Sequence, residues 1–295
     1  MNTAAPHPLS RRRWITGVAA VTSLAALGRA AAAPRWQIGC YTRPWLEHEP
    51  LVALDAIAAA GYRYVGLMNA KGGFVIGPDT PPEKVATIGT EAKARGLAIV
   101  STYGGDFFVP KSPADSIARL RRLIDHCALC GCPSLLLGGT GKAELVDAYY
   151  HAVAESCAHA AGKGVGLTIK PHGGTNATGP ECRRLIEKVG HPNLRVWYDP
   201  GNIYYYSEGQ RDPVADAATV DGLVAGMSVK DFTPPKEVNV TPGTGRVDFP
   251  KVMARLRQGG FTGGPLVVEC LARGDLTATL AAAKQARLFV EALVQ

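Results

Sequence analysis

The amino-acid sequence predicts a single closed (β/α)8 barrel, the TIM barrel class of α/β fold, over residues 34–295. Short apolar runs and helical patterns alternate eight times from residue 35 onward. The apolar runs show no polar alternation, which is typical of parallel strands covered by helices on both faces. Eight such units in about 260 residues match a closed barrel better than a doubly wound sheet. No linker rich in Pro, Gly or Ser interrupts them, so we expect one domain.

Each predicted strand is followed by a helical segment, and several of these segments end in glycine. Gly61 and Gly96, for example, lie between a helical pattern and the next apolar run. Glycine most readily adopts the left-handed conformation in which many helices end. The eight strands are predicted at residues 36–41, 62–68, 97–103, 134–139, 165–170, 194–199, 222–231 and 265–270.

Residues 1–33 have the composition of an export signal rather than of a folded domain. The basic segment SRRRWITG (residues 10–17) precedes a short apolar run and an Ala-x-Ala cleavage pattern. Adjacent arginines after a serine are typical of a twin-arginine signal. The apolar run is shorter than the roughly 20 residues that a membrane span requires. We therefore expect cleavage near Ala32, transport by the twin-arginine translocase, a periplasmic or otherwise exported location, and no stable membrane anchor.

The composition argues against several function classes. The formal net charge is +7, but the predicted signal contributes four arginines and no acidic residue. The remainder carries 7 − 4 = +3, too little to indicate a nucleic-acid partner. The seven cysteines are odd in number and irregularly spaced, so we expect buried thiols rather than disulfide bonds. The sequence leaves a homo-oligomer open.

Polar residues gather where the predicted strands end, which is where barrel enzymes build their active sites. The fifth apolar strand ends in Lys-Pro-His, and a lysine is rarely buried in a core without a partner. The sixth strand ends in Asp-Pro-Gly-Asn, and the eighth ends in a glutamate. The strand-end residues are Tyr41, Arg43, Trp45, Asn69, Lys71, Lys170, His172, Asp199, Asn202, Ser228, Lys230, Asp231 and Glu269.

Three of these side chains suit a divalent cation, namely His172, Asp199 and Glu269, because carboxylates and imidazoles are common ligands. A metal ion there would polarise the carbonyl of a sugar and acidify the neighbouring C–H bond. Two of these residues also have a simpler interpretation. Asp199 fits the start of a turn, and His172 fits a loop hydrogen bond.

Two further segments allow more than one interpretation. Lys230 and Asp231 are interpreted as a buried ion pair that orients a loop. The aromatic run at residues 203–206, which includes Tyr204, fits either packing beneath a lid or stacking on a sugar ring.

At these residues the chain resembles the xylose isomerase-like TIM barrel family, which includes sugar phosphate isomerases/epimerases, ketose 3-epimerases and endonuclease IV barrels. The resemblance covers roughly residues 35–293. It rests on Asp-Pro-Gly-Asn (199–202), Lys-Asp (230–231), the loop PGTGRVDFPKVM (242–253) and Glu269. A DNA-repair activity conflicts with the predicted export.

The resemblance implies a metal site that this sequence only partly retains. Epimerases of the family typically hold Mn, Mg, Co or Zn with a Glu, an Asp, a His and a Glu on strands five to eight. Asp199 and Glu269 match two of these positions. Lys170 stands at the first Glu position and Ser228 at the His position. A cation about 4 Å from Lys170 would be repelled by about 4 kcal/mol at an effective dielectric near 20.

Four interpretations of Lys170 follow. In the first, His172 replaces the missing ligand and completes a metal site with Asp199 and Glu269, while Lys170 points away. In the second, the Lys170 ammonium takes the place of the metal between the two carboxylates. In the third, Lys170 has a lowered pKa and acts as a base or Schiff-base amine. In the fourth, the site binds sugar without turnover.

The resemblance implies proton removal beside a carbonyl through an enediolate, and we expect an exported sugar isomerase/epimerase-like enzyme. Catalytic roles are predicted for Glu269 as general base, Lys170 and His172. A lyase that eliminates the aglycone from 3-keto-glycosides and a periplasmic carbohydrate-binding protein are the alternatives. Substrate-binding roles are predicted for Tyr41, Trp45, Asn202, Tyr204, Lys230, Asp231 and Arg246.

Overall fold

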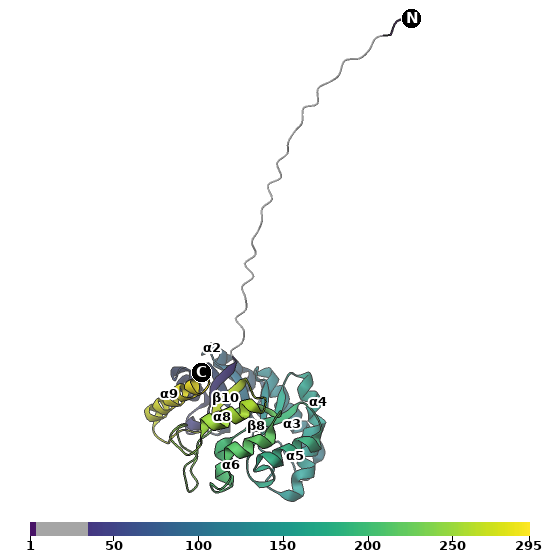
Figure 1. Ribbon diagram of the computed structural model, residues 1–295. Helices are drawn as coiled ribbons and strands as arrows, with labels where there is room; N and C mark the ends of the chain where they lie inside the picture. Colours follow the sequence, from purple (N-terminus) through teal and green to yellow (C-terminus); the bar gives the residue numbers. More distant parts are fainter. Residues whose placement is uncertain (4–34) are drawn as a thin grey trace. The chain divides into compact units, whose positions relative to one another are not determined.

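The computed structural model describes residues 1–3 and 35–295 (Figure 1). The predicted export signal falls on residues 4–34 for nearly all its length, outside the described residues, and stays a prediction. Within the described part of the chain, every helix is too short or too polar to cross a bilayer.

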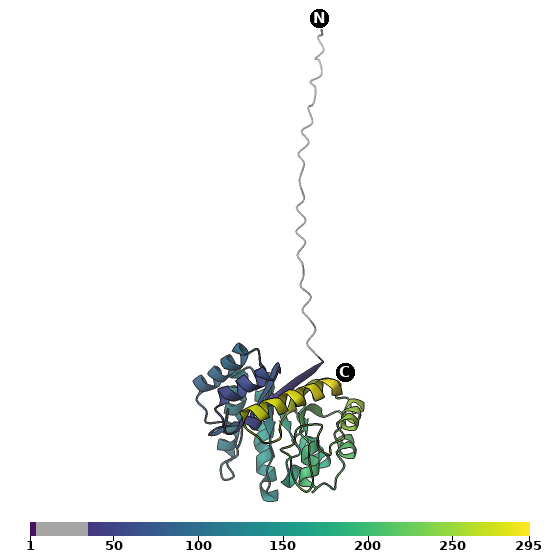
Figure 2. The ribbon, with the colours of Figure 1, turned by 90° about the vertical axis from the view of Figure 1, so that its left-hand side faces the viewer.

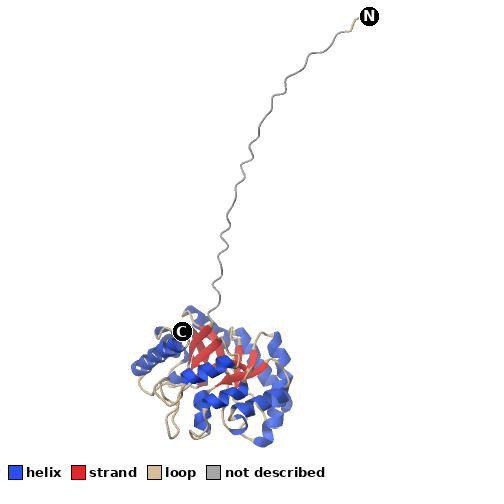
Figure 3. Cartoon of the chain, in the orientation of Figure 1, coloured by secondary structure: helices blue, strands red, loops and turns tan. Residues whose placement is uncertain are grey.

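Eight parallel strands close into a barrel, which confirms the predicted fold class. Their order around the barrel is β1, β10, β9, β8, β7, β6, β5 and β2. Helices surround the strands on the outside (Figure 3). The barrel strands are β1 (Trp36–Tyr41), β2 (Tyr64–Leu67), β5 (Ala98–Tyr103), β6 (Ser134–Leu137), β7 (Gly166–Ile169), β8 (Leu194–Tyr198), β9 (Val224–Val229) and β10 (Gly264–Val268).

A short antiparallel hairpin follows β2 and was not predicted from the sequence. It consists of β3 (Asn69–Ala70) and β4 (Gly73–Phe74). At two residues per strand, it is too short to produce an alternating pattern. The hairpin matters because it brings Asn69 and Phe74 to the cavity described below.

One helical segment follows each barrel strand, except that β8 is followed by two short helices. The last helix, α9, packs against β1 and β10, so the two ends of the barrel domain lie side by side (Figure 2). The five glycines that precede β2, β5, β6, β7 and β10 all have positive φ, as predicted. The helices are α1 (Pro50–Ala59), α2 (Pro82–Ala94), α3 (Pro113–Leu129), α4 (Val146–Gly162), α5 (Gly179–Val189), α6 (Pro200–Tyr206), α7 (Pro213–Ala217), α8 (Phe249–Gln258) and α9 (Leu276–Leu293).

The barrel interior contains an apolar layer beneath the strand ends. Most of the core lies between the strands and the surrounding helices. All seven cysteines are buried and unpaired, as their number and spacing predicted. The interior layer is formed by Tyr41, Met68, Val100, Leu136, Trp197 and Val267.

Candidate functional site

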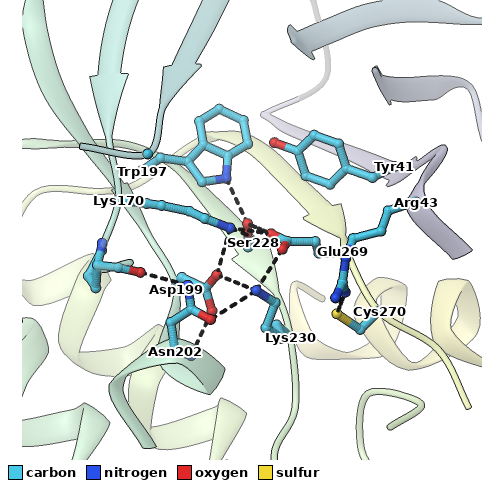
Figure 4. A network of polar contacts seen from close by, with 12 residues as sticks. Tyr41, Arg43, Lys170, Trp197, Asp199, Asn202, Ser228, Lys230, Glu269 and Cys270 are labelled. Atoms are coloured by element: carbon cyan, nitrogen blue, oxygen red, sulfur yellow. Dashed lines mark hydrogen bonds and ion pairs between the residues drawn. The ribbon is translucent and has the colours of Figure 1, made fainter. Parts of the chain in front are cut away.

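Four charged residues come directly after four neighbouring strands. Lys170 follows β7, Asp199 follows β8, Lys230 follows β9 and Glu269 follows β10. The carboxyl ends of parallel strands meet at one end of a barrel, so these four side chains converge (Figure 4). They alternate in sign from one strand to the next.

The Lys170 ammonium lies between the two carboxylates. Its Nζ donates to Asp199 Oδ2 at 3.2 Å and to both oxygens of Glu269 at 3.0 and 2.8 Å. The Lys170 side chain is only 1% exposed, so water does not screen these contacts. This geometry matches the second interpretation of Lys170, in which its ammonium occupies the place of a metal ion. It disagrees with the first, in which Lys170 points away.

Lys230, which follows β9, belongs to the same cluster. Its Nζ lies 3.0 Å from Asp199 Oδ2 and 2.6 Å from Glu269 Oε1, and it donates to Asn202 Oδ1 at 3.0 Å. Burial lowers the pKa of Lys230, but the charges of Asp199 and Glu269 outweigh burial and raise it. Lys230 therefore remains a cation at neutral pH.

The predicted Lys230–Asp231 ion pair is wrong. Asp231 instead accepts backbone N–H groups from the loop before α8, including Gly243 at 3.0 Å, Gly245 at 2.8 Å and Val247 at 3.0 Å. The Lys230 side chain is instead bound to Asp199, Glu269 and Asn202. Asp231 orients the loop as predicted, without the lysine.

Glu269 has no free acceptor site in this arrangement. Its Oε1 accepts from Lys170 and lies 2.6 Å from Lys230 Nζ, while its Oε2 accepts from Lys170 and, at 2.6 Å, from Ser228 Oγ. Ser228 Oγ in turn accepts from Trp197 Nε1 at 3.1 Å. Burial favours a higher pKa for Glu269, but the nearby cations hold its pKa well below the usual range. The prediction of Glu269 as general base therefore does not agree with its environment.

Asp199 has two roles. Its Oδ2 binds the two lysines, and its Oδ1 accepts the Asn202 N–H at 2.9 Å, which caps α6. Pro200 fits the first position of this helix. Gly201 is required because a Cβ atom there would lie 2.6 Å from the Lys230 carbonyl oxygen. The Asp-Pro-Gly-Asn segment therefore starts a helix and supplies a charged group at the same time.

His172 lies beside the charged cluster rather than within it. Its ring centroid is 6.2 Å from that of Tyr103 and 5.7 Å from that of Tyr206. Burial and then the charges of Lys170 and Lys230 lower the pKa of His172 to about 3, so the imidazole is neutral. The next residue, Gly173, has a φ of 79°, and a Cβ atom there would lie 2.5 Å from the Tyr206 ring. The glycine lets the strand-end loop approach this tyrosine.

The predicted metal site of His172, Asp199 and Glu269 does not fit these side chains. Among the described residues, no three His, Cys, Asp or Glu side chains are arranged to hold a metal ion. The physical reason is that two ammonium groups occupy the space between the carboxylates and use their lone pairs. A divalent cation at this position would have to displace Lys170 and Lys230.

A cavity of about 300 Å³ opens above the cluster. It continues into a depression of about 540 Å³ that shares Phe74, Tyr103 and His172 with it. A smaller depression of about 190 Å³ is also next to the cavity, and Arg43 and Glu269 line both. The cavity is lined by Arg43, Met68, Asn69, Phe74, Tyr103, Lys170, His172, Asn202, Tyr205, Tyr206, Lys230, Val238 and Glu269.

Five predicted substrate-binding residues lie elsewhere, and one of them, Asp231, binds the loop before α8 as described above. Tyr41 is fully buried and donates to Ser101 Oγ at 2.9 Å, and Trp45 belongs to the main core. Tyr204 stacks on Phe232 rather than facing the cavity. The Arg246 guanidinium carbon lies over the Tyr204 ring, 4.6 Å from the ring centroid. Residue type and strand-end position identified these residues, but only the tertiary structure defines which way a side chain points.

The sequence analysis did not assign roles to several residues that line the cavity. Tyr103 is the last residue of β5, so the strand-end rule could have identified it. Tyr205 and Tyr206 belong to the same aromatic run as Tyr204 but face the cavity. Arg43 lies two residues after β1 and was noted only as a polar strand-end residue.

The parallel eight-stranded barrel, with polar groups at the carboxyl ends of its strands, defines a TIM barrel protein. A family model described as xylose isomerase-like TIM barrel matches residues 54–293. The chain belongs to this family, as the resemblance of its strand-end motifs implied.

Solved structures of similar fold include sugar epimerases. A xylose isomerase domain protein from Planctomyces limnophilus is 20% identical, with a TM-score of 0.69 over 88% of this chain and 98% of that one. D-allulose 3-epimerase from Methylomonas sp., in complex with D-allulose, is 17% identical, with a TM-score of 0.68 over 88% and 97%. D-psicose 3-epimerase from Clostridium cellulolyticum H10, with D-tagatose, is 14% identical, with a TM-score of 0.66 over 88% and 99%. A search of curated proteins found no match.

Proposed function

We propose that this protein is an exported sugar isomerase or epimerase that enolises its substrate with lysine cations in place of a metal ion. The observation that carries the proposal is the Lys170 ammonium between Asp199 and Glu269, at the floor of an open cavity. Membership of a family whose solved relatives include ketose epimerases supports a carbohydrate substrate. The predicted export signal supports an unphosphorylated sugar.

In the proposed reaction, the substrate carbonyl oxygen approaches the Lys170 and Lys230 ammonium groups. Preorganised donors stabilise the negative charge that develops on this oxygen as the neighbouring C–H bond breaks. Asp199 and Glu269 hold both ammonium groups in place. These carboxylates act as positioning residues, because their oxygens are already bonded to the cations.

His172 is the proposed base. Its neutral imidazole lines the cavity and has a lone pair at physiological pH. Its pKa is low because the ring is buried and because the lysine charges oppose a further cation nearby. An enediolate bound to the lysines would reduce this opposition, so proton transfer becomes easier as the oxyanion forms. Return of the proton from His172 to the neighbouring carbon completes an isomerisation, whereas an epimerisation also requires a second proton donor on the opposite face of the enediolate.

Tyrosines also line the cavity. Tyr103 and Tyr206 flank the His172 ring, and burial raises the pKa of both phenols, that of Tyr103 to about 12. Both hydroxyls are therefore protonated at neutral pH and able to donate to sugar oxygens. Aromatic faces also pack against the C–H faces of sugar rings.

The test is solvent hydrogen exchange in D2O, followed by proton NMR, with a panel of ketoses, aldoses, sugar acids and 3-keto-glucosides. We expect loss of the C–H signal beside the carbonyl of at least one substrate. Lys170→Met should lower the exchange rate by about 10²–10³-fold, whereas Lys251→Met, which removes an exposed surface lysine, should leave it unchanged. Binding of a sugar without exchange in the wild-type protein would contradict the enzyme proposal and favour a binding protein.

Metal dependence is tested in the same preparations. Purification without chelators, followed by elemental mass spectrometry, should find far less than one divalent ion per chain. Added EDTA should leave the exchange rate unchanged. A tightly held ion whose removal stops exchange would show that the lysines move aside to admit a metal, and would contradict this mechanism.

A second candidate is a lyase that acts on 3-keto-glycosides. The depression of about 540 Å³ beside the cavity, which Phe74, Tyr103 and His172 also line, provides room for an aglycone. His172 would take the proton from the carbon beside the carbonyl, a C=C bond would form, and the C–O bond to the aglycone would break. Tyr103 would protonate the departing oxygen. Release of the free aglycone from a 3-keto-glucoside in the NMR assay distinguishes this reaction from isomerisation.

A further inference from the structure

The cluster at the strand ends has one cation more than its carboxylates neutralise. Lys170 and Lys230 contact both Asp199 and Glu269, so two positive and two negative charges balance. Arg43 lines the same cavity and adds a third positive charge. The neutral His172 adds none. The cavity therefore carries a net charge of about +1 before a ligand binds.

Arg43 continues the alternation of charges around the barrel. It follows β1, which pairs with β10, the strand that carries Glu269. In Figure 4 the Arg43 side chain lies on the other side of Glu269 from Lys170. The strand on the far side of β1 is β2, which is followed by the apolar Met68. The series of alternating charges thus ends on a positive group with a carboxylate on one side only.

No carboxylate balances Arg43 within ion-pair distance among the described residues. Its guanidinium contacts the Cys270 sulfur instead. Burial raises the pKa of the Cys270 thiol, so this partner is neutral at pH 7. Residues 4–34 contain no Asp or Glu and cannot supply the missing charge. Other charged groups near the mouth, such as Glu47 and Asp106, are exposed and screened by water.

We propose that Arg43 binds a carboxylate of the substrate, so that the protein acts on a sugar acid rather than on a neutral sugar. This inference rests on the proposed function and specifies its substrate class. An arginine fork matches a carboxylate in a bidentate geometry. One carboxylate would bring the net charge of the cavity to zero. A phosphate monoester carries about −1.5 to −2 at pH 7 and would overcompensate it.

The position of Arg43 allows a bound sugar acid to reach Arg43 and the lysines at the same time. Arg43 faces both the main cavity and the 190 Å³ depression, whereas Lys170 faces the main cavity alone. A sugar acid would place its carboxylate at Arg43 and its carbonyl at the lysines. The charge that orients the substrate is then separate from the charges that stabilise the oxyanion.

The experiment is isothermal titration calorimetry at pH 7 with matched pairs of probes. D-Glucuronate is compared with D-glucose, and D-galacturonate with D-galactose. Glucose 6-phosphate and inorganic phosphate are the probes of higher negative charge. We expect at least one hexuronate to bind roughly tenfold or more tightly than its neutral partner. Equal or weaker binding of both hexuronates, their failure to bind, or tighter binding of the phosphates would overturn the proposal.

Variants locate the anion site. Arg43→Met should remove the preference for the carboxylate, and Arg43→Lys should retain part of it, because lysine keeps the charge but not the fork. Arg184→Met, at an exposed position on α5, is the matched control and should bind as the wild type does. If Arg43→Met fails to fold, a preference unchanged in Arg43→Lys and in Arg43→Gln would overturn the assignment.

The outcomes separate this inference from the proposed function. Hexuronate binding that depends on Arg43, without hydrogen exchange in D2O, would support the anion site and contradict the enzymatic proposal. Hydrogen exchange on a neutral ketose, with no preference for sugar acids, would support the enzymatic proposal and contradict the anion site.

Discussion

The two halves of the barrel rim differ in the residue that follows each strand. After β7, β8, β9 and β10 these residues are Lys170, Asp199, Lys230 and Glu269, all charged and all buried. After β1, β2, β5 and β6 they are Thr42, Met68, Gly104 and Gly138, all uncharged. Both sets lie at equivalent positions of one fold, so the fold itself does not require charge there. The four charged residues reflect chemistry, and the uncharged residues at the equivalent positions reflect packing.

The comparison also shows how buried charges are tolerated. Removing an ion from water costs several kcal/mol unless partners compensate it. Neighbouring strands lie only about 4.8 Å apart, so alternating signs place each charge next to its opposite. The uncharged half is stabilised by close packing, as where the Tyr41 ring lies against Gly66 and leaves no space for a Cβ atom. Substitutions in the two halves should therefore have different consequences.

The largest effect is expected in the charged half. Lys170→Met should lower kcat/KM by about 10²–10³-fold, because it removes a preorganised donor to the oxyanion. It should also destabilise the protein by about 3–5 kcal/mol, since it breaks a buried ion-pair network. Urea unfolding and the exchange assay measure the two effects. A variant with near-normal kcat/KM would show that the charges at this rim serve stability alone.

A substitution in the interior layer beneath the uncharged half should separate stability from activity. Leu136→Ala removes a buried side chain and should cost about 2–5 kcal/mol of unfolding free energy. The layer lies below the cavity, so kcat/KM per folded molecule should stay within about threefold. A loss of activity as large as that of Lys170→Met would break the division between the two halves.

Ser228→Ala should have an intermediate effect, because Ser228 links the two regions. Its hydroxyl joins the Trp197 indole of the apolar layer to Glu269 of the charged cluster. The alanine variant leaves the buried indole N–H without a partner, at a cost of about 1–3 kcal/mol. Ser156→Ala is the control, since that buried hydroxyl donates only to a carbonyl of its own helix. Equal losses of unfolding free energy in the two variants would show that the hydrogen bond between Ser228 and Glu269 does not contribute to stability.

The smallest effect on activity concerns pH. His172 has a folded-state pKa near 3 instead of about 6.5. It stays neutral between pH 8 and 5, so kcat/KM should not fall near pH 6.5 through its protonation. The unfolded chain does bind that proton, so stability should decline as pH falls from about 6.5 toward 3. His172→Gln should reduce this decline, as measured by urea unfolding at a series of pH values. An activity profile with an acid limb near 6.5 that disappears in His172→Gln would contradict the lowered pKa.

Much of the fold could be predicted from the sequence because its signals are local. Uniformly apolar runs identified all eight barrel strands, and β1 was predicted at its observed bounds, 36–41. Glycines at helix ends were recognisable because their conformation depends on their own backbone. The hairpin of β3 and β4 was missed, since two-residue strands carry no periodicity.

The site was predictable in position but not in connectivity. Strand-end rules correctly placed Lys170, His172, Asn202, Lys230 and Glu269 around one cavity. They did not show that Asp231 turns away from Lys230, or that Tyr204 turns away from the cavity while Tyr206 faces it. These choices depend on packing against other elements, such as Phe232 beneath Tyr204.

The sequence by itself determined the barrel, its strand ends and the unusual lysine after β7, because periodicity and residue order act over short distances. Only the tertiary structure decided what that lysine does. Lys170 and Glu269 are 99 residues apart in the chain, and closure of the barrel brings them within 2.8 Å. Whether a carboxylate binds a metal or a lysine depends on which charges share its space, and that is a property of the folded chain.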